Sequence, residues 1–133
     1  MELIHSYETT IIWLLFFHWV ADFLTQTRTI GKNKSKSISA LGTHVITYMF
    51  MLFALSTIIF QNAEIAGYFV LLNGGLHFIT DFFTSRIGKY FYKNSITSKD
   101  CEDRWMYLFW ANIGIDQFIH TATLIYTLKY FIL

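Results

Sequence analysis

The sequence predicts an all-α fold, and more specifically a polytopic integral membrane protein built as a bundle of four transmembrane helices. Two observations favour this fold. Apolar residues make up 54% of the chain and charged residues only 14%, whereas about a quarter of a soluble domain is charged. Four stretches also approach the roughly 20 largely apolar residues that a membrane-spanning helix needs. The length of 133 residues predicts a single domain over residues 1–133.

The four predicted spans are residues 8–27, 39–60, 65–86 and 105–131. The second is the most apolar, because apolar residues lie on every side of a helix drawn from Val45 to Phe60. A helix on the surface of a soluble protein keeps one polar face. This stretch is therefore the main argument against a water-soluble four-helix bundle.

The connections between the spans predict an orientation. Basic residues gather in the two predicted loops, residues 28–38 and 87–104, and are absent from the short connection at residues 61–64. Because basic loops stay on the cytoplasmic side, we expect both loops to be cytoplasmic and both termini to lie outside a bacterial inner or plasma membrane.

Composition also excludes several classes of function. The net charge is +1 and the basic residues form only two short stretches, which argues against nucleic acid as a partner. Cys101 is the one cysteine, so a disulfide framework and a cysteine-rich zinc module are both excluded.

Within the predicted spans, polar residues recur at steps of four, which keeps them on one face of each helix. The first span carries His18, Asp22 and Gln26; the third carries Asn73, His77 and Asp81; the fourth carries Asn112, Asp116 and His120, with Gln117 adjacent; the second adds His44 and Tyr48. Each of these spans therefore presents a narrow polar stripe. Gly74, Gly75 and Gly114 lie beside the stripes and predict close helix packing.

The predicted orientation brings these stripes to one level. Spans one and three run inward and read His then Asp, while span four runs outward and reads Asp then His. All three then place the histidine nearer the midplane and the aspartate nearer the cytoplasm. One aspartate at the centre of a membrane helix costs about 2.5–3.5 kcal/mol, and such residues normally face the bundle interior and are functional. We therefore expect a single polar site inside the bundle.

The motifs His18-x-x-x-Asp22-x-x-x-Gln26, Asn33-Lys34, His44, His77-x-x-x-Asp81 and Asp116-Gln117-x-x-His120 occur in this order over nearly the whole chain. In this respect the chain resembles a family of small integral membrane proteins of bacteria and their phages that is classified only as a domain of unknown function. The resemblance implies a multi-helix membrane fold and names no reaction.

The first interpretation of the site is a divalent transition metal centre, holding zinc, iron or manganese, since imidazole and carboxylate suit these ions and soft ligands are missing. The candidate ligands, for one ion or for two that share a bridging carboxylate, are His18, Asp22, His44, His77, Asp81, Asp116 and His120. Gln26, Tyr48, Asn73, Asn112 and Gln117 are the candidates to orient those ligands or a substrate. Such a centre can belong to a membrane-embedded enzyme that acts on a lipid or small molecule near the cytoplasmic leaflet.

Two other interpretations stay open. Intramembrane Asp and His chains also form proton relays and ion paths, and a transporter with four short spans would need to form a homo-oligomer. Alternatively, the polar residues lock the bundle together and bind nothing. Interhelical polar contacts contribute only about 0.6 kcal/mol on average, which is small beside the cost of burying three aspartates.

Overall fold

The computed structural model describes residues 6–98 and 102–132, and every regular element in these ranges is a helix. The elements are α1 (Tyr7–Trp19), the π-helix η1 (Val20–Leu24), α2 (Arg28–Asn33), α3 (Ile38–Phe60), α4 (Ala63–Thr97) and α5 (Glu102–Ile132). The all-α prediction is confirmed. Cys101 lies outside the described residues.

Polar residues define where the helices begin. The Ser6 and Ser37 hydroxyls accept hydrogen bonds from the first-turn amides of α1 and α3, and the Asn62 side chain does the same for two amides of α4. These side chains satisfy amides that have no partner within the helix. Gln61, with φ of 51°, ends α3 in the left-handed region and reverses the chain directly into α4.

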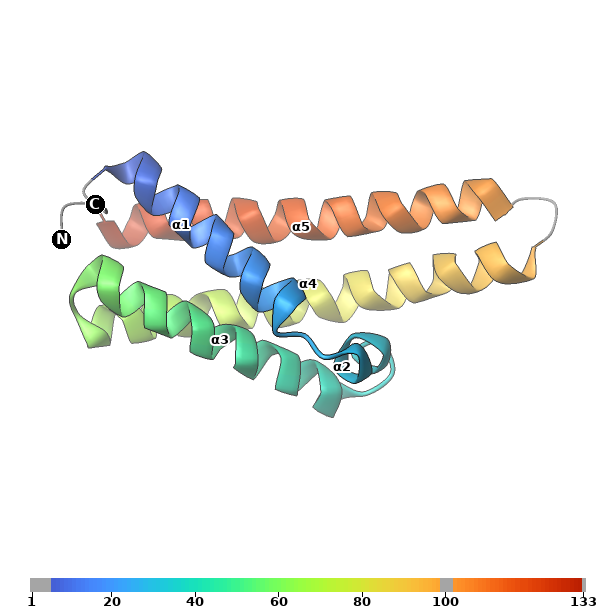
Figure 1. Ribbon diagram of the computed structural model, residues 1–133, viewed down its shortest axis with the longest axis horizontal. Coiled ribbons are helices and arrows are strands. Elements are labelled where there is room, and N and C mark those ends of the chain that lie inside the picture. The colour runs from blue at the N-terminus through green and yellow to red at the C-terminus, as the bar shows by residue number, and fades with distance from the viewer. Residues whose placement is uncertain (1–5, 99–101, 133) are drawn as a thin grey trace.

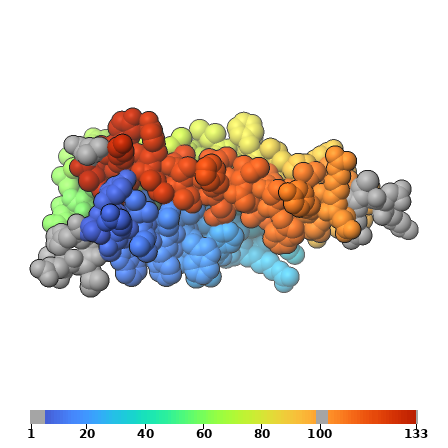
Figure 2. Space-filling view, turned by 90° about the horizontal axis from the view of Figure 1, so that it is seen from above, coloured from blue at the N-terminus to red at the C-terminus, as the bar shows by residue number. Residues whose placement is uncertain are grey.

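The long helices pack side by side (Figure 1). α4 and α5 form an antiparallel pair, α3 runs back along one half of α4, and α1 crosses α5 obliquely so that η1 lies near the middle of the molecule. Seen from above, α1 and α5 cover neighbouring parts of one face of an elongated molecule (Figure 2). Four helices therefore meet around one central region.

The predicted loop at residues 87–104 is wrong over most of its length, because α4 continues to Thr97 and α5 begins at Glu102. The extension is stabilised by aromatic pairs between the two helices, Phe91 with Trp105 and Tyr92 with Phe109, whose ring centroids lie 6.1 and 5.5 Å apart. The predicted loop at residues 28–38 likewise contains the short helix α2. Residues 99–101 of the predicted loop fall outside the described ranges.

One half of the bundle has an apolar core. Leu14, Leu52, Phe69, Leu124 and Leu128 are buried there against one another. Large apolar side chains also cover the outside of the molecule, among them Ile46, Phe50, Leu71, Ile79, Phe118 and Tyr126.

Among the described helices, α3 alone has the length and apolar composition to cross a membrane, and a core helix of a soluble protein can share that character. α1 is too short at 13 residues, and α4 and α5 are less apolar and carry polar stripes. The prediction of four spans is therefore not confirmed and stays a prediction.

The glycines differ in their surroundings. A Cβ atom added at Gly74 would lie 2.5 Å from the Met49 sulfur, whereas a Cβ at Gly75 or Gly114 would meet nothing within 4 Å. Gly74 therefore lies against the Met49 side chain, which would have to shift to accommodate a larger residue at position 74. The predicted role in close packing is not seen for Gly75 or Gly114.

Candidate metal centre

The candidate centre begins at a local change in helix geometry. The chain switches from α-helix to π-helix at Val20, and the Thr25 amide bonds to the Val20 carbonyl five residues back. Single π turns inside α-helices often occur at functional sites. Here the π turn carries Asp22, which is buried and faces α3, α4 and α5.

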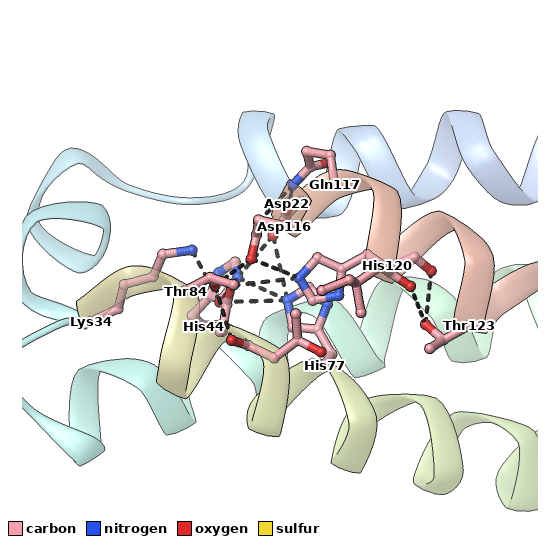
Figure 3. Close-up of polar contacts among 12 residues, drawn as sticks. Asp22, Lys34, His44, His77, Thr84, Asp116, Gln117, His120 and Thr123 are labelled. Carbon is pink, nitrogen blue, oxygen red and sulfur yellow. Dashed lines mark hydrogen bonds and ion pairs between the residues drawn. The ribbon is translucent and has the colours of Figure 1, made fainter. Parts of the chain in front are cut away.

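Four ligand side chains from three elements, η1, α3 and α4, converge beside this turn (Figure 3). His44 Nε2 lies 3.0 Å from Asp22 Oδ1, 3.2 Å from Asp81 Oδ2 and 3.2 Å from His77 Nε2. His77 Nε2 lies 3.4 Å from Asp22 Oδ1 and 3.7 Å from Asp81 Oδ2. All four side chains are buried, and together they form a group that could hold a metal ion.

A second group adjoins the first. Asp22, Asp116 and His120 are also buried and close enough to share an ion. His120 Nε2 lies 3.5 Å from Asp116 Oδ1 and 3.6 Å from Asp81 Oδ1. Asp22 belongs to both groups, and Asp81 turns one oxygen toward His44 and the other toward His120, so either carboxylate could bridge two ions.

Neighbouring side chains fix these ligands in place. The Gln117 amide donates to Asp22 Oδ2 at 2.7 Å and to Asp116 Oδ2 at 3.1 Å. The His77 ring is stacked between Tyr48 and His120, with centroid separations of 4.1 and 4.0 Å. Hydrogen bonds and packing of this kind orient metal ligands in proteins.

The cluster opens into a cavity of about 760 Å³ that lies among η1, α2, the second half of α4 and the first half of α5. Lys34 reaches over this cavity, and its ammonium group contacts Asp81 Oδ2 at 3.0 Å. The aspartates Asp22, Asp81 and Asp116 therefore line the cavity, whereas the three histidines lie behind them and are buried.

Of the seven predicted ligands, the structure brings six into the two groups and leaves out His18. The His18 ring lies next to the cluster, with its centroid 5.5 Å from that of His120 and 5.9 Å from that of His77. A π turn, Val20–Leu24, begins between His18 and Asp22, so an unbroken α-helix does not join the two residues.

The residues predicted to orient the ligands also fall into two sets, those that lie at the cluster or its cavity and those that lie elsewhere. Gln117 and Tyr48 contact ligands, and Gln26 lines the cavity. Asn112 instead donates to the Thr84 carbonyl, and Asn73 accepts from Thr127 and donates to its own helix. These last two residues join α4 to α5.

Sequence reasoning missed two contacts to the cluster. The Thr84 hydroxyl donates a short hydrogen bond to Asp116, and the Lys34 ammonium pairs with Asp81. Thr84 could have been found, because it follows Asp81 by three residues and so lies on the same stripe. The Lys34 pairing depends on the path of the chain after η1, for which the sequence has no signal.

The geometry of the first group suits a metal ion. Two ligands about 2.1 Å from a tetrahedral zinc ion lie about 3.4 Å apart. The five measured separations among His44, His77, Asp22 and Asp81 fall between 3.0 and 3.7 Å. These separations lie on both sides of 3.4 Å, so the four side chains are already close to the spacing of a coordination shell.

A family model described as "Protein of unknown function (DUF3307)" matches residues 10–133. The chain therefore belongs to this family, whose description assigns no reaction. No curated protein and no solved structure matches the chain.

Proposed function

We propose that this member of the DUF3307 family is an integral membrane protein whose buried histidine and aspartate residues bind a divalent transition metal ion near the cytoplasmic face. The observation that carries the proposal is the surroundings of His44 Nε2, which has three ligand atoms within 3.2 Å. A neutral imidazole nitrogen carries at most one proton and can donate it to one acceptor only. A cation at the centre of the group accounts for all three close approaches at once.

Charge and hydrogen bonding both favour an ion over a purely structural polar core. Three buried aspartates face one another across the cluster, and Lys34 is the one lysine or arginine with an ion pair to them among the described residues. Asp81 Oδ1 and His77 Nδ1 are buried yet make no hydrogen bond. Buried polar networks with a structural role are normally satisfied.

The donor set narrows the choice of metal. Imidazole nitrogens and carboxylate oxygens suit zinc, iron and manganese, whereas copper(I) prefers sulfur ligands. The two adjoining groups, with Asp81 between them, are compatible with one ion or with a bridged pair.

The distribution of polar and apolar surface supports a membrane location. Charged and polar side chains fill the interior of the cluster, while Phe50, Phe118 and Ile46 are 77%, 71% and 68% exposed on the outside of the same helices. Soluble monomers rarely expose large contiguous apolar patches. At 1.5 Å per residue, Asp22, His44, Asp81 and Asp116 each lie about 22–27 Å from the end of their own helical segment on the side of the α3–α4 turn. This is within the cytoplasmic half of a 30 Å hydrocarbon layer oriented as predicted.

Access from one side favours an enzyme over a transporter. The cavity reaches the cluster from the side of α2, whereas Leu14, Leu52, Phe69 and Leu128 close the bundle beyond it. A transported ion or a proton relay would need a polar path through that apolar core. A bound ion in an open cavity can instead activate water or polarise an ester.

The test is elemental analysis of the full chain purified in detergent and reconstituted with zinc, iron or manganese. We expect stoichiometric transition metal in the wild type, and loss of most of it in Asp81→Ala and in Asp116→Ala. Lys36→Ala, a charge change at the cavity rim outside both ligand groups, should keep its metal. Circular dichroism establishes that each variant is folded. A folded wild type that takes up none of the three metals would overturn the proposal.

A further inference from the structure

The cavity above the cluster has a basic rim over an acidic floor. Five lysines line it, namely Lys32, Lys34, Lys36, Lys89 and Lys93, and its acidic residues are the aspartates Asp22, Asp81 and Asp116. The lysines come from the segment around α2 and from the end of α4, so the fold brings together two basic stretches that lie far apart in the sequence. A divalent ion would offset most of the aspartate charge and leave the cavity strongly cationic, which favours an anionic ligand.

The side walls of this cavity are apolar. Phe23, Tyr92, Ile96, Phe109 and Ile113 line it beside the lysines. Ile96 and Phe23 are 66% and 46% exposed, so the wall continues to the outer surface of the molecule. A ligand with a charged head and an apolar tail fits this arrangement better than a free inorganic ion.

Lys34 lies between the floor and the rim. Its ammonium group contacts Asp81 Oδ2, the same oxygen that lies 3.2 Å from His44 Nε2. A metal ion that takes this oxygen competes with the ammonium group, which then becomes available to a ligand held over the metal. Gln26 Oε1 and Ser85 Oγ are further polar atoms of cavity-lining residues, buried and without a hydrogen-bond partner.

We propose that this cavity binds the phosphate headgroup of an anionic phospholipid, with the phosphate between the metal cluster and Lys34 and the acyl chains along the Phe23–Ile96 wall. This inference rests on the proposed function, since the metal supplies the inner contact to the phosphate. Metal ions polarise phosphoryl oxygens, and basic pockets on the cytoplasmic side of membrane helices bind phosphate headgroups.

The experiment is calorimetric titration of the metal-loaded full chain in non-ionic detergent with three probes. They are dihexanoyl phosphatidic acid, dihexanoyl phosphatidylcholine and inorganic phosphate, each below any micelle-forming concentration. We expect phosphatidic acid to bind at least about fivefold more tightly than either of the others. Lys34→Gln should weaken its binding by a similar factor, the effect of one lysine near an anionic headgroup. Lys129→Gln, which removes a lysine near the end of α5 outside the cavity, should leave it unchanged.

Metal content measured on the same samples distinguishes a failure of the headgroup assignment from a failure of the proposed metal-binding function. Metal-loaded protein that binds phosphatidylcholine as tightly as phosphatidic acid, or Lys34→Gln that binds phosphatidic acid at full strength, overturns the headgroup assignment alone. If inorganic phosphate binds as tightly as phosphatidic acid, the assignment of the ligand as a lipid is overturned. Binding that depends on Lys34 in a chain that takes up no metal upholds the cavity assignment and overturns the metal centre.

Discussion

His44 and His18 both lie on the polar stripes of the sequence, yet their contacts differ. His44 Nε2 is within 3.2 Å of two carboxylate oxygens and a second imidazole nitrogen. The His18 ring instead packs beside the rings of His77 and His120. We expect His44→Ala to weaken zinc binding by more than about 100-fold, since even residues that merely support metal ligands contribute 10–100-fold. Competition with a zinc chelator of known affinity measures this change.

His18→Ala is the matched control, because it removes an equally buried imidazole from the same region. It should retain stoichiometric zinc, with affinity reduced by no more than about tenfold. Equal loss of zinc in both variants would contradict the assignment of His44 as a ligand and of His18 as a residue beside the ligands.

At the scale of single residues, the sequence predicts which residues form the site better than it predicts how they are arranged. The step of four correctly indicates that His77 and Asp81 share a face of α4, and that Asp116 and His120 share a face of α5. His18 lies beside the two ligand groups and not in them, and the π turn at Val20–Leu24 that follows it is not encoded in the periodicity. Contacts between segments far apart in the chain, such as Lys34 with Asp81, depend on tertiary structure and leave no local pattern.

At the scale of the helices, Gly74 of α4 lies in close contact with Met49 of α3. Gly74→Ala would place a methyl group 2.5 Å from the Met49 sulfur and 2.6 Å from its Cγ, so the side chain or the helix must shift. Such overpacking costs about 1–3 kcal/mol. We expect the free energy of unfolding in mixed micelles, followed by circular dichroism, to fall by this amount.

Gly75→Ala provides the comparison at the next position of the same helix. Its added methyl group meets nothing within 4 Å, and alanine favours a helix by up to about 1 kcal/mol over glycine. This variant should therefore be as stable as the wild type or more so. The two variants behaving alike would mean that α3 and α4 do not approach closely at Gly74.

The existence of the long helices was predictable, and their ends were not. Hydropathy marks the apolar part of each helix, so the α3 prediction of residues 39–60 agrees with Ile38–Phe60. Residues 87–97 are polar and basic enough to suggest a loop, but they continue α4 because their aromatic side chains pack on α5. Packing between helices, rather than local polarity, sets that boundary.

At the scale of the whole molecule, the cluster brings together side chains from η1, α3, α4 and α5. An ion in the first group would tie η1, α3 and α4 together, and an ion in the second group would tie η1 to α5. Zinc at 100 times its dissociation constant should stabilise the folded chain by about 2.7 kcal/mol. We expect a chelator to lower the apparent melting temperature of the wild type and to leave that of Asp81→Ala unchanged. A wild-type melting temperature that does not respond to the chelator would contradict a shared ion.

The proposed membrane orientation makes a separate prediction for the two ends of α3. Glu64, just after the α3–α4 turn, should face the outside, and Lys36, just before α3, should face the cytoplasm. In a Cys101→Ser background, a membrane-impermeant maleimide applied to intact spheroplasts should label Glu64→Cys and spare Lys36→Cys. Permeabilised spheroplasts should label both, because each residue is exposed. The reverse pattern would invert the orientation and move the basic cavity to the outer face, whereas release of the protein by alkaline carbonate would exclude a membrane-spanning bundle. Labelling as expected would set the lysine rim on the side where basic segments meet anionic lipid headgroups.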